Sequence, residues 1–429
     1  MDVQVRTERY ADQGRCVTHI DGRVAFVRFA LPGELVRITL DEPHDRDDRF
    51  WTGEVAEVLE ASPDRVEPAW PLAGPLAMGG GVGGADLVHV SLPGQLKWKA
   101  ATIREQMQRL GRVEPDELGE VTVERMPGDE ALGGLNWRTR IELIADEDGY
   151  ASMRRRGSHT RVRLDGMPLA SRRLLAMAER EHVWEGGFVP GAQIRLVAPE
   201  PREALQPSAD QADDGNFAVL VGGEVSAGSA TVTERMSVDG HDFRYAVASS
   251  GFWQIHREAP MRLPEHVLGL VREALDGAES AVLWDLYSGS GLFSLPMAAL
   301  AAPRTRMLTV EGAPEAVRHA RRNLREAGLD AVDARCGDVY ATLQHVPHDL
   351  ESPDVVVLDP PRAGARAKVC RRIAASGAAA VIYVACDPTS LARDTATFAS
   401  LGYGLASLRA FDIYPMTHHV ETVALFRRA

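Results

Sequence analysis

The sequence contains only four cysteines among 429 residues, and no two of them have the C-x-x-C spacing. This scarcity excludes a cysteine-rich metal site, and a disulfide framework is not expected in a chain of this size. The cysteines are Cys16, Cys336, Cys370 and Cys386. At most one or two of these thiols are expected to take part in chemistry.

Long apolar runs are also missing. No run approaches the roughly 18 residues that a membrane span needs, and the first residues, MDVQVRTERYADQG, lack the apolar core of a secretory signal. Hydrophobic residues make up 45% and charged residues 25% of the chain, which is typical of a globular protein. We therefore expect a cytoplasmic protein, with no membrane contact.

Basic residues do not dominate, because 61 Asp and Glu outnumber 48 Lys and Arg and leave a net charge of −13. This balance argues against a protein that coats nucleic acid indiscriminately. A local cluster of arginines could still bind phosphates, and MRRRGSHTRVR at 153–163 is such a cluster. Arg154, Arg155 and Arg156 are predicted to contact RNA; a solvated basic face is an equally good interpretation.

The length predicts two or three domains. Residues 1–62 hold short β-type runs, and the pairs Asp21-Gly22 and Pro32-Gly33 are turn signals between them. This pattern favours either a small barrel of the kind that binds oligonucleotides or a generic β module. Residues 63–257 begin with a Pro- and Gly-rich loop, continue with a helix over 95–111, and then mix strands and helices, so we expect an α+β domain. An acidic segment, 200–216, is expected to be an exposed loop.

Residues 258–429 alternate apolar strand-like runs with amphipathic helix-like runs. This alternation predicts an α/β domain with a doubly wound parallel sheet that binds ligands at the carboxyl ends of its strands. The final run, HHVETVALFRRA, is expected to return to the sheet as its last strand.

Glycines and acids follow the expected strands of this domain. Gly289-x-Gly291 alone is a weak cofactor signal, because it lacks the third glycine of a dinucleotide fingerprint. Glu311 ends the next strand, where a carboxylate can bind both hydroxyls of a ribose, in NAD as well as in S-adenosylmethionine. Asp338 and Asp359 end the third and fourth strands. Four such strand ends in series favour the class I methyltransferase sheet over a dehydrogenase.

Cys386, in VIYVACDP, follows an apolar strand and precedes a proline that starts a helix. A thiol at a helix N-terminus feels the positive end of the helix dipole, so we expect a lowered pKa. Glu421 begins the last strand and is either a surface ion-pair partner or a partly buried general base. His418 and His419 are too few for a metal site without further ligands.

Three segments resemble a known family: DPPRAG (359–364), VIYVACD (381–387) and FDIYPMTHHVE (411–421) are similar to the signatures of the RNA uracil-5 methyltransferases. The resemblance covers the whole chain. GRVAFVRFALPGE is similar to the TRAM domain that precedes the catalytic unit in many members, and SGFWQIH (250–256) resembles the segment that supplies a cofactor-binding glutamine, here Gln254.

The resemblance implies a mechanism and a substrate. Cys386 would add to C6 of uracil, S-adenosylmethionine would methylate C5, and Glu421 would remove the C5 proton. Asp359 would lie between cofactor and base. The implied partner of this presumed monomeric enzyme is structured RNA, with ribosomal RNA of the large subunit favoured over tRNA by the TRAM-like module, and both N-terminal domains would contact it. The residues implied to bind the cofactor are Gln254, Tyr287, Gly289, Leu292, Glu311, Asp338 and Asp359.

The sequence also departs from the family. Leu292 stands where many members have Asn, and Ala385 where Ser is usual. Relatives often hold an iron–sulfur cluster through four cysteines, and Val82, Ala85, Met167 and, by a weaker match, Trp70 occupy those positions here. We therefore expect no iron–sulfur cluster, and we expect these four side chains to pack together instead. Two other functions stay open: a cytosine C5-methyltransferase, and an RNA-binding protein that has lost catalysis.

Overall fold

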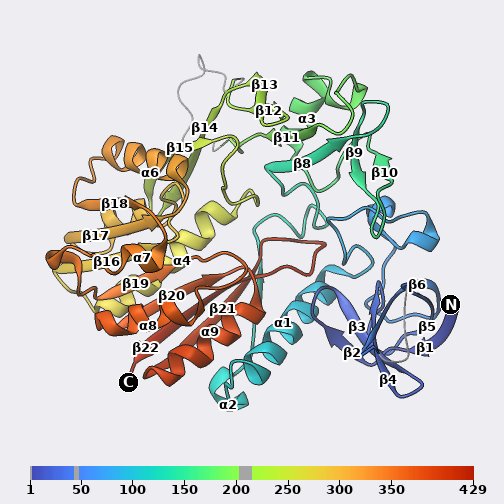
Figure 1. Ribbon diagram of the computed structural model, residues 1–429, viewed down its shortest axis with the longest axis horizontal. Coiled ribbons are helices and arrows are strands. Elements are labelled where there is room, and N and C mark those ends of the chain that lie inside the picture. Colours follow the sequence, from blue (N-terminus) through green and yellow to red (C-terminus); the bar gives the residue numbers. More distant parts are fainter. Residues whose placement is uncertain (1, 43–47, 202–214) are drawn as a thin grey trace.

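The computed structural model describes residues 2–42, 48–201 and 215–429. Three parts follow one another along the chain in Figure 1: a small N-terminal sheet in blue, a second sheet in green, and a large sheet with helices in yellow to red. Most of the acidic segment predicted to be an exposed loop, 200–216, lies outside the described residues.

The N-terminal part is a six-stranded, barrel-like sheet with the order β1-β5-β6-β4-β3-β2. Alternate residues of its strands are buried, as with Val36, Ile38 and Leu40 on β5, which is the pattern of a sheet with one covered face. Asp21 and Gly22 both have positive φ, 50° and 80°, in the turn between β3 and β4, and confirm the predicted hairpin. The strands are β1 (Asp2–Arg6), β2 (Arg9–Ala11), β3 (Arg15–Ile20), β4 (Arg23–Arg28), β5 (Leu35–Leu40) and β6 (Trp51–Glu60).

A loop with two short 3-10 helices, η1 (Pro71–Ala73) and η2 (Leu76–Met78), leads to helix α1 (Leu92–Arg109). The side chain of Ser91 accepts a hydrogen bond from the Gly94 N–H and caps α1. A short helix, α2 (Pro115–Leu118), and strand β7 (Val123–Arg125) follow.

These elements show that the predicted boundary at residue 257 is too simple. Helix α1 packs against α9 (Pro388–Ser400), and β7 pairs in parallel with β21 (Tyr403–Asp412) at the edge of the large sheet. The sequence pattern missed this because a three-residue strand carries no readable periodicity of its own.

The middle part is an antiparallel sheet with the order β10-β9-β8-β11-β12-β13. Helix α3 (Arg172–Arg180) and the 3-10 helix η3 (Val183–Glu185) lie between β10 and β11 in the chain. A separate hairpin of β14 (Thr231–Val238) and β15 (His241–Ala248) precedes the strands of the large sheet other than β7. The strands of the middle sheet are β8 (Arg140–Ala145), β9 (Ala151–Arg154), β10 (Arg161–Arg163), β11 (Gln193–Val197), β12 (Ala218–Val221) and β13 (Glu224–Gly228).

The large sheet has the order β18-β17-β16-β19-β20-β22-β21-β7. Its first five strands are parallel, and β22 returns antiparallel to β20, so the predicted doubly wound α/β fold and its last strand are confirmed. The further strands are β16 (Ser280–Leu286), β17 (Arg304–Glu311), β18 (Val332–Cys336), β19 (Val355–Leu358), β20 (Ala380–Ala385) and β22 (Glu421–Arg428). The further helices are α4 (Ala259–Leu275), α5 (Ser294–Leu300), α6 (Pro314–Glu326), α7 (Val339–Thr342), α8 (Arg366–Ser376) and the 3-10 helix η5 (His348–Leu350).

Both faces of this sheet are buried. On β19, Val355 and Val357 belong to one hydrophobic cluster, while Val356 and Leu358 belong to the cluster on the other face. Burial on both faces explains the continuous apolar runs of these strands. Strand order reverses between β16 and β19, and sheets of this kind bind their ligands in the crevice outside the carboxyl ends of the strands at such a point. Among the helices of the described ranges, none is both long and apolar enough to cross a membrane.

Candidate active site

The turn after β16 is shaped to bring backbone close to a ligand. Tyr287, Gly289 and Gly291 all have positive φ, at 64°, 55° and 96°. A Cβ on Gly291 would lie 2.9 Å from Leu295 Cδ1, so this position requires glycine. A bulky residue such as Tyr287 rarely adopts positive φ, and such strain concentrates at functional sites. Burial, with a smaller contribution from Asp338, raises the pKa of Tyr287 to about 12.

Glu311, the last residue of β17, fastens this turn. Its carboxylate accepts hydrogen bonds from the N–H of Gly289 at 3.0 Å and from the N–H of Ala313 at 2.7 Å. The turn after β16 and the end of β17 are thereby held together at the crevice. The sequence prediction placed Glu311 and Gly289 at this edge, and the structure brings them into direct contact.

Asp285, on β16, belongs to the same edge and was missed in the sequence. It is fully buried; the Ser294 hydroxyl donates to its Oδ2 atom, while Oδ1 has no hydrogen-bond partner within the described chain. Burial, together with the nearby charge of Glu311, raises the pKa of Asp285 to about 7, against the opposing effect of the Ser294 hydrogen bond. An acid inside an apolar strand, two residues before the Gly-rich turn begins, was the available signal.

Three further residues predicted to bind the cofactor differ in their surroundings. Gln254 is only 4% exposed, and its Oε1 atom has no protein partner among the residues described. Asp338 lies two residues beyond β18, is exposed, and caps α7 by accepting the Ala341 N–H at 2.9 Å. Leu292 is buried in the hydrophobic cluster on one face of the sheet, so its side chain replaces a polar contact with core packing.

Asp359, Cys386 and Glu421 form the second half of the site. Asp359 directly follows β19, Cys386 directly follows β20, and Glu421 begins β22, the neighbour of β20. Burial, with the charges of Asp285 and Glu311, raises the pKa of Asp359 to about 7. Burial, and then Asp359, raises the pKa of Glu421 well above its ordinary value. The Glu421 Oε1 atom is buried and accepts no hydrogen bond from any described residue.

The expected lowering of the Cys386 pKa is wrong for this state of the protein. Burial, followed by the charges of Glu421 and Asp359, raises the pKa of Cys386 to about 12. The N-terminus of α9 does not reverse this, because the Asp387 carboxylate already accepts the N–H groups of Thr389 and Ser390. Arg362 is the cation that opposes the rise.

The loop that carries Asp359 and Arg362 is anchored to helix α9 by hydrogen bonds. Asp394 on α9 accepts hydrogen bonds from the Ala365 N–H at 2.8 Å and from the Tyr383 hydroxyl at 2.7 Å. Gly364 has a φ of 76°, and a Cβ there would lie 2.7 Å from Asp394 Oδ2. The glycine of the DPPRAG motif therefore allows the loop to reach its anchor.

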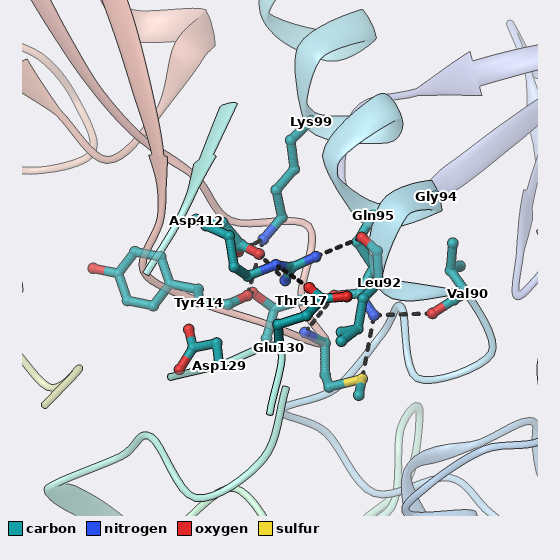
Figure 2. A network of polar contacts seen from close by, with 12 residues as sticks. Val90, Leu92, Gly94, Gln95, Lys99, Asp129, Glu130, Asp412, Tyr414 and Thr417 are labelled. Atoms are coloured by element: carbon teal, nitrogen blue, oxygen red, sulfur yellow. Dashed lines mark hydrogen bonds and ion pairs between the residues drawn. The ribbon is translucent and has the colours of Figure 1, made fainter. Parts of the chain in front are cut away.

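Helix α1 holds the segment between β21 and β22, as Figure 2 shows. Lys99 and Asp412 are both completely buried and form an ion pair, and Arg125 pairs with the other oxygen of Asp412. Lys99 also donates to the Tyr414 carbonyl at 3.0 Å, and Gln95 accepts the Met416 N–H at 2.9 Å. The segment leading to Glu421 is thus tied to α1 at three points.

His418 and His419 complete this segment without forming a metal site. The Asp86 carboxylate accepts from the His418 N–H at 3.0 Å and contacts His418 Nδ1 at 2.6 Å. Burial lowers the pKa of His419 to about 3, and Arg362 donates to its Nε2 atom at 3.2 Å. Over the described ranges, no group of three or more His, Cys, Asp or Glu is arranged to hold a metal ion.

The four residues that the family resemblance aligns with cluster ligands are apolar and buried. Trp70, Val82, Ala85 and Met167 are at most 4% exposed and belong to one hydrophobic cluster. The four residues therefore lie in the same apolar core, and direct packing of their side chains against one another stays a prediction.

One arginine of the basic segment, Arg156, supports this loop through hydrogen bonds to its backbone. Arg156 donates to the carbonyls of Val82 at 2.7 Å and Gly74 at 2.6 Å, and its guanidinium lies 4.5 Å from the centre of the Phe29 ring. Arg156 therefore braces the loop, and its contact with RNA stays a prediction. Arg155 is half-buried beside Gly81, and Arg154 is exposed; for these two, RNA contact also stays a prediction.

Comparison with known proteins agrees with this geometry. Residues 221–429 match the family model described as tRNA (Uracil-5-)-methyltransferase. The chain is 68% identical over its whole length to an uncharacterized RNA methyltransferase of Bifidobacterium longum, of which it covers 97%. It is 30% identical to the 23S rRNA (uracil(1939)-C(5))-methyltransferase RlmD of Chromohalobacter salexigens, with 98% of this chain and 88% of that protein covered.

The fold has a solved counterpart. The crystal structure of Pyrococcus abyssi tRNA (uracil-54, C5)-methyltransferase in complex with S-adenosyl-L-homocysteine matches 99% of this chain and 100% of that one, with a TM-score of 0.66 and 20% identity. The fold is that of a class I, S-adenosylmethionine-dependent methyltransferase. Within that class, the chain belongs to the RNA uracil-5 methyltransferase family.

Proposed function

We propose that this enzyme methylates C5 of a uridine in large-subunit ribosomal RNA, with Cys386 as a covalent nucleophile and Glu421 as the base. The observation that carries the proposal is the grouping of a thiol and two carboxylates at adjacent strand ends. Asp359 raises the pKa of Glu421, and both carboxylates raise the pKa of Cys386. Perturbed titratable groups gathered at a ligand crevice are a mark of catalytic sites.

The crevice suits S-adenosylmethionine, which supplies an activated methyl group on a sulfonium. Two buried oxygens, Gln254 Oε1 and Asp285 Oδ1, lack protein partners in the part of the chain described, and buried polar atoms normally have one. Glu311 holds the Gly-rich turn at the strand end where a ribose would bind. These three residues would hold the cofactor, and Tyr287, Gly289 and Asp338 would line its site.

Cys386 begins the reaction. Uracil C5 is a poor nucleophile, and addition of sulfur to C6 shifts the C5–C6 electron pair into an enolate whose C5 can accept the methyl group. Because burial raises the pKa of the thiol to about 12 in the free protein, its proton must pass to the neighbouring Asp359 carboxylate as the C6–S bond forms. A base in folded RNA must also leave its stack to reach this thiol.

Glu421 ends the reaction. After methyl transfer, C5 carries both a methyl group and a proton, and the unpartnered Oε1 atom of Glu421 is the acceptor for that proton. The C5–H electron pair then re-forms the C5–C6 double bond, and the C6–S bond breaks. Asp359 would lie between the cofactor and the uracil. Its carboxyl group, protonated or charged, would be close to both.

The choice of ribosomal RNA rests on the relatives. Proteins named as 23S rRNA methyltransferases align with this chain over nearly its full length, including the N-terminal barrel. Mapping of 5-methyluridine in ribosomal and transfer RNA from cells with and without the gene tests this choice. Loss of a 5-methyluridine from tRNA alone would contradict it.

Cys386→Ala tests the nucleophile. We expect it to abolish methyl transfer and leave S-adenosylmethionine binding intact, because the thiol acts on the base. Cys336→Ala, which removes an exposed thiol, is the matched control and should keep full activity. Substantial turnover by Cys386→Ala would eliminate the covalent mechanism.

Glu421→Gln tests the base. This variant should still add Cys386 to the uracil and accept the methyl group, but it should not release the product. A protein–RNA adduct that survives denaturant is therefore expected to accumulate, detectable as a slow band on a denaturing gel. Release of methylated RNA at the normal rate would assign the proton to another group.

A further inference from the structure

A cavity of about 560 Å³ opens in front of Cys386, on the side of the N-terminal barrel. Asp12, Gln13, Arg15 and Arg28 of the barrel line it together with Cys386 and Arg362 of the large domain. The nucleophile and a wall of the barrel therefore share one solvent-filled space.

The barrel wall is held in place by direct contacts with the large domain. The Trp98 indole on α1 donates to the Ala11 carbonyl at 3.1 Å, and the Thr389 hydroxyl on α9 donates to Asp12 Oδ2 at 3.3 Å. Gly14 lies so close to Asp86 that a Cβ there would be 2.4 Å from Oδ2. The turn between β2 and β3 is thus fixed over the thiol.

Four guanidinium groups line this cavity, and two of them have their partners within the protein. Arg28 donates to both oxygens of Asp41, at 2.7 and 2.6 Å, and Arg156 braces the loop carbonyls. Among the residues that the structure describes, the Arg362 guanidinium has its one hydrogen bond with the neutral ring of His419. Arg15 forms no hydrogen bond or ion pair through its side chain with any residue that the structure describes, and its Nε atom is buried. Burial and the charge of Arg28 lower the pKa of Arg15.

The carboxylates of the cavity are already occupied. Asp86 binds His418, Asp387 caps α9, and Asp12 accepts from Thr389 and from the Gln13 N–H. The cavity thus offers two arginines whose donors lack acidic partners, beside a thiol that acts on a nucleotide. The charges of Asp41 and Asp12 act on Arg15 without direct contact. A half-buried guanidinium whose donors have no acceptor is stabilised when an anion joins it, and its planar donors match a phosphate.

We propose that Arg15 of the N-terminal barrel, together with Arg362, binds a backbone phosphate of the RNA strand next to the target uridine. The barrel is then part of the active site rather than a separate tether for RNA. This proposal rests on the proposed function, because it takes the nucleotide in front of Cys386 to be RNA.

The test compares Arg15→Gln with Arg37→Gln. Arg37 lies on β5 of the same barrel, is paired with Glu57 at 2.6 Å and does not line the cavity, so its loss removes the same charge elsewhere. We measure the Kd for an unmodified ribosomal RNA fragment over a range of salt concentrations. Arg15→Gln should raise the Kd roughly tenfold or more and flatten the slope of log Kd against log salt by about 0.7–1. Arg37→Gln should leave both unchanged.

A second arm identifies the anion. Two RNAs are made, each with a neutral methylphosphonate in place of one of the two phosphates that flank the target uridine. One of them should bind the wild type more weakly than unmodified RNA does. Arg15→Gln should not weaken the binding of that RNA any further. Wild-type Kd and slope in Arg15→Gln would overturn the proposal. A second result would also overturn it: inorganic phosphate stabilises the protein only when Arg15 is present, but RNA binding does not require Arg15. The site would then bind a free anion.

The outcomes separate this site from the proposed function. If Cys386→Ala keeps its methyl transfer while Arg15→Gln weakens RNA binding, the covalent mechanism fails and the phosphate site stands. If Cys386→Ala is inactive and Arg15→Gln binds RNA normally, the phosphate site fails alone. S-adenosylmethionine binding by Arg15→Gln, expected to equal that of the wild type, shows that the variant is folded.

Discussion

Two regions of this molecule bury acids in opposite ways. At the interface of α1 with the segment before Glu421, the buried Asp412 is paired with Lys99 and Arg125. At the carboxyl edge of the large sheet, Asp285 and Glu421 are equally buried but have no cation in contact, and each keeps an oxygen without a partner in the described structure. The first arrangement satisfies its charges internally, and the second does not.

This difference separates positioning from chemistry. A buried charge with close counter-charges keeps its ionised form and fixes the geometry of the groups around it. A buried carboxyl without one has a raised pKa and can exchange a proton or accept a ligand near neutral pH. The protein therefore holds the Glu421 segment with a satisfied ion-pair network (Figure 2) and leaves Glu421 itself unsatisfied.

Asp412→Asn should have the largest effect on stability. It leaves the completely buried Lys99 ammonium without its counter-charge, and loss of one partner of a buried pair costs about 3–5 kcal/mol. Asp64→Asn is the matched control, because Asp64 pairs with Lys97 on the same helix, whose side chain is 60% exposed, and exposed pairs contribute about 0–1 kcal/mol. Urea unfolding of both variants measures the difference. Equal losses would show that the buried pair has no special role.

Asp285 makes the stability of the cofactor-free protein depend on pH. Its pKa is raised from 3.8 to about 7, so the protonated form is favoured by folding, and this contribution is lost as pH rises from about 4 through 7. We expect the melting temperature of Asp285→Asn to fall less than that of the wild type between pH 5 and pH 8. Parallel melting curves in the two proteins would mean that Asp285 does not titrate in this range.

Glu311→Ala should weaken S-adenosylmethionine binding by about 1.5–3 kcal/mol, the range for hydrogen bonds to a charged group. The loss includes the support that Glu311 gives to the Gly289 turn. Glu326→Ala, which removes an exposed acid at the end of α6 that pairs with Arg322, should leave the affinity unchanged. Titration calorimetry of both variants provides the measurement, and an unaltered Kd for Glu311→Ala would place the ribose elsewhere.

The strand-end residues of the large sheet could be predicted because their position follows from local pattern. Each of Glu311, Asp359 and Cys386 follows or ends an apolar run that leads into a turn and a helix. In a parallel sheet this local pattern places all three at the carboxyl edge, independently of long-range contacts. The ionisation of Cys386 could not be predicted in this way. It depends first on burial and then on Glu421, which is 35 positions away in the sequence and comes near the thiol through the pairing of β20 with β22.

The role of α1 in holding the segment before Glu421 could not be predicted from the local sequence either. Lys99 and Gln95 look like ordinary surface residues of an amphipathic helix, and their partners Asp412 and Met416 lie more than 300 residues later. The same holds for Arg156, whose basic neighbours suggest RNA while its donors bind loop carbonyls. Long-range partners, rather than residue type, decide these roles.

The smallest expected effect concerns a third buried region, which holds apolar side chains instead of paired or unpaired acids. The family resemblance aligns Trp70, Val82, Ala85 and Met167 with the ligands of an iron–sulfur cluster, and all four are buried in one apolar core. Clusters of this kind need cysteine ligands, and the four cysteines of this chain lie on β3, at the end of β18, on α8 and after β20. Protein purified anaerobically is therefore predicted to contain no stoichiometric iron or acid-labile sulfide, and a strong chelator should leave its melting temperature unchanged. A chelator-sensitive melting temperature together with bound iron would show that a metal, and not apolar packing, holds this loop.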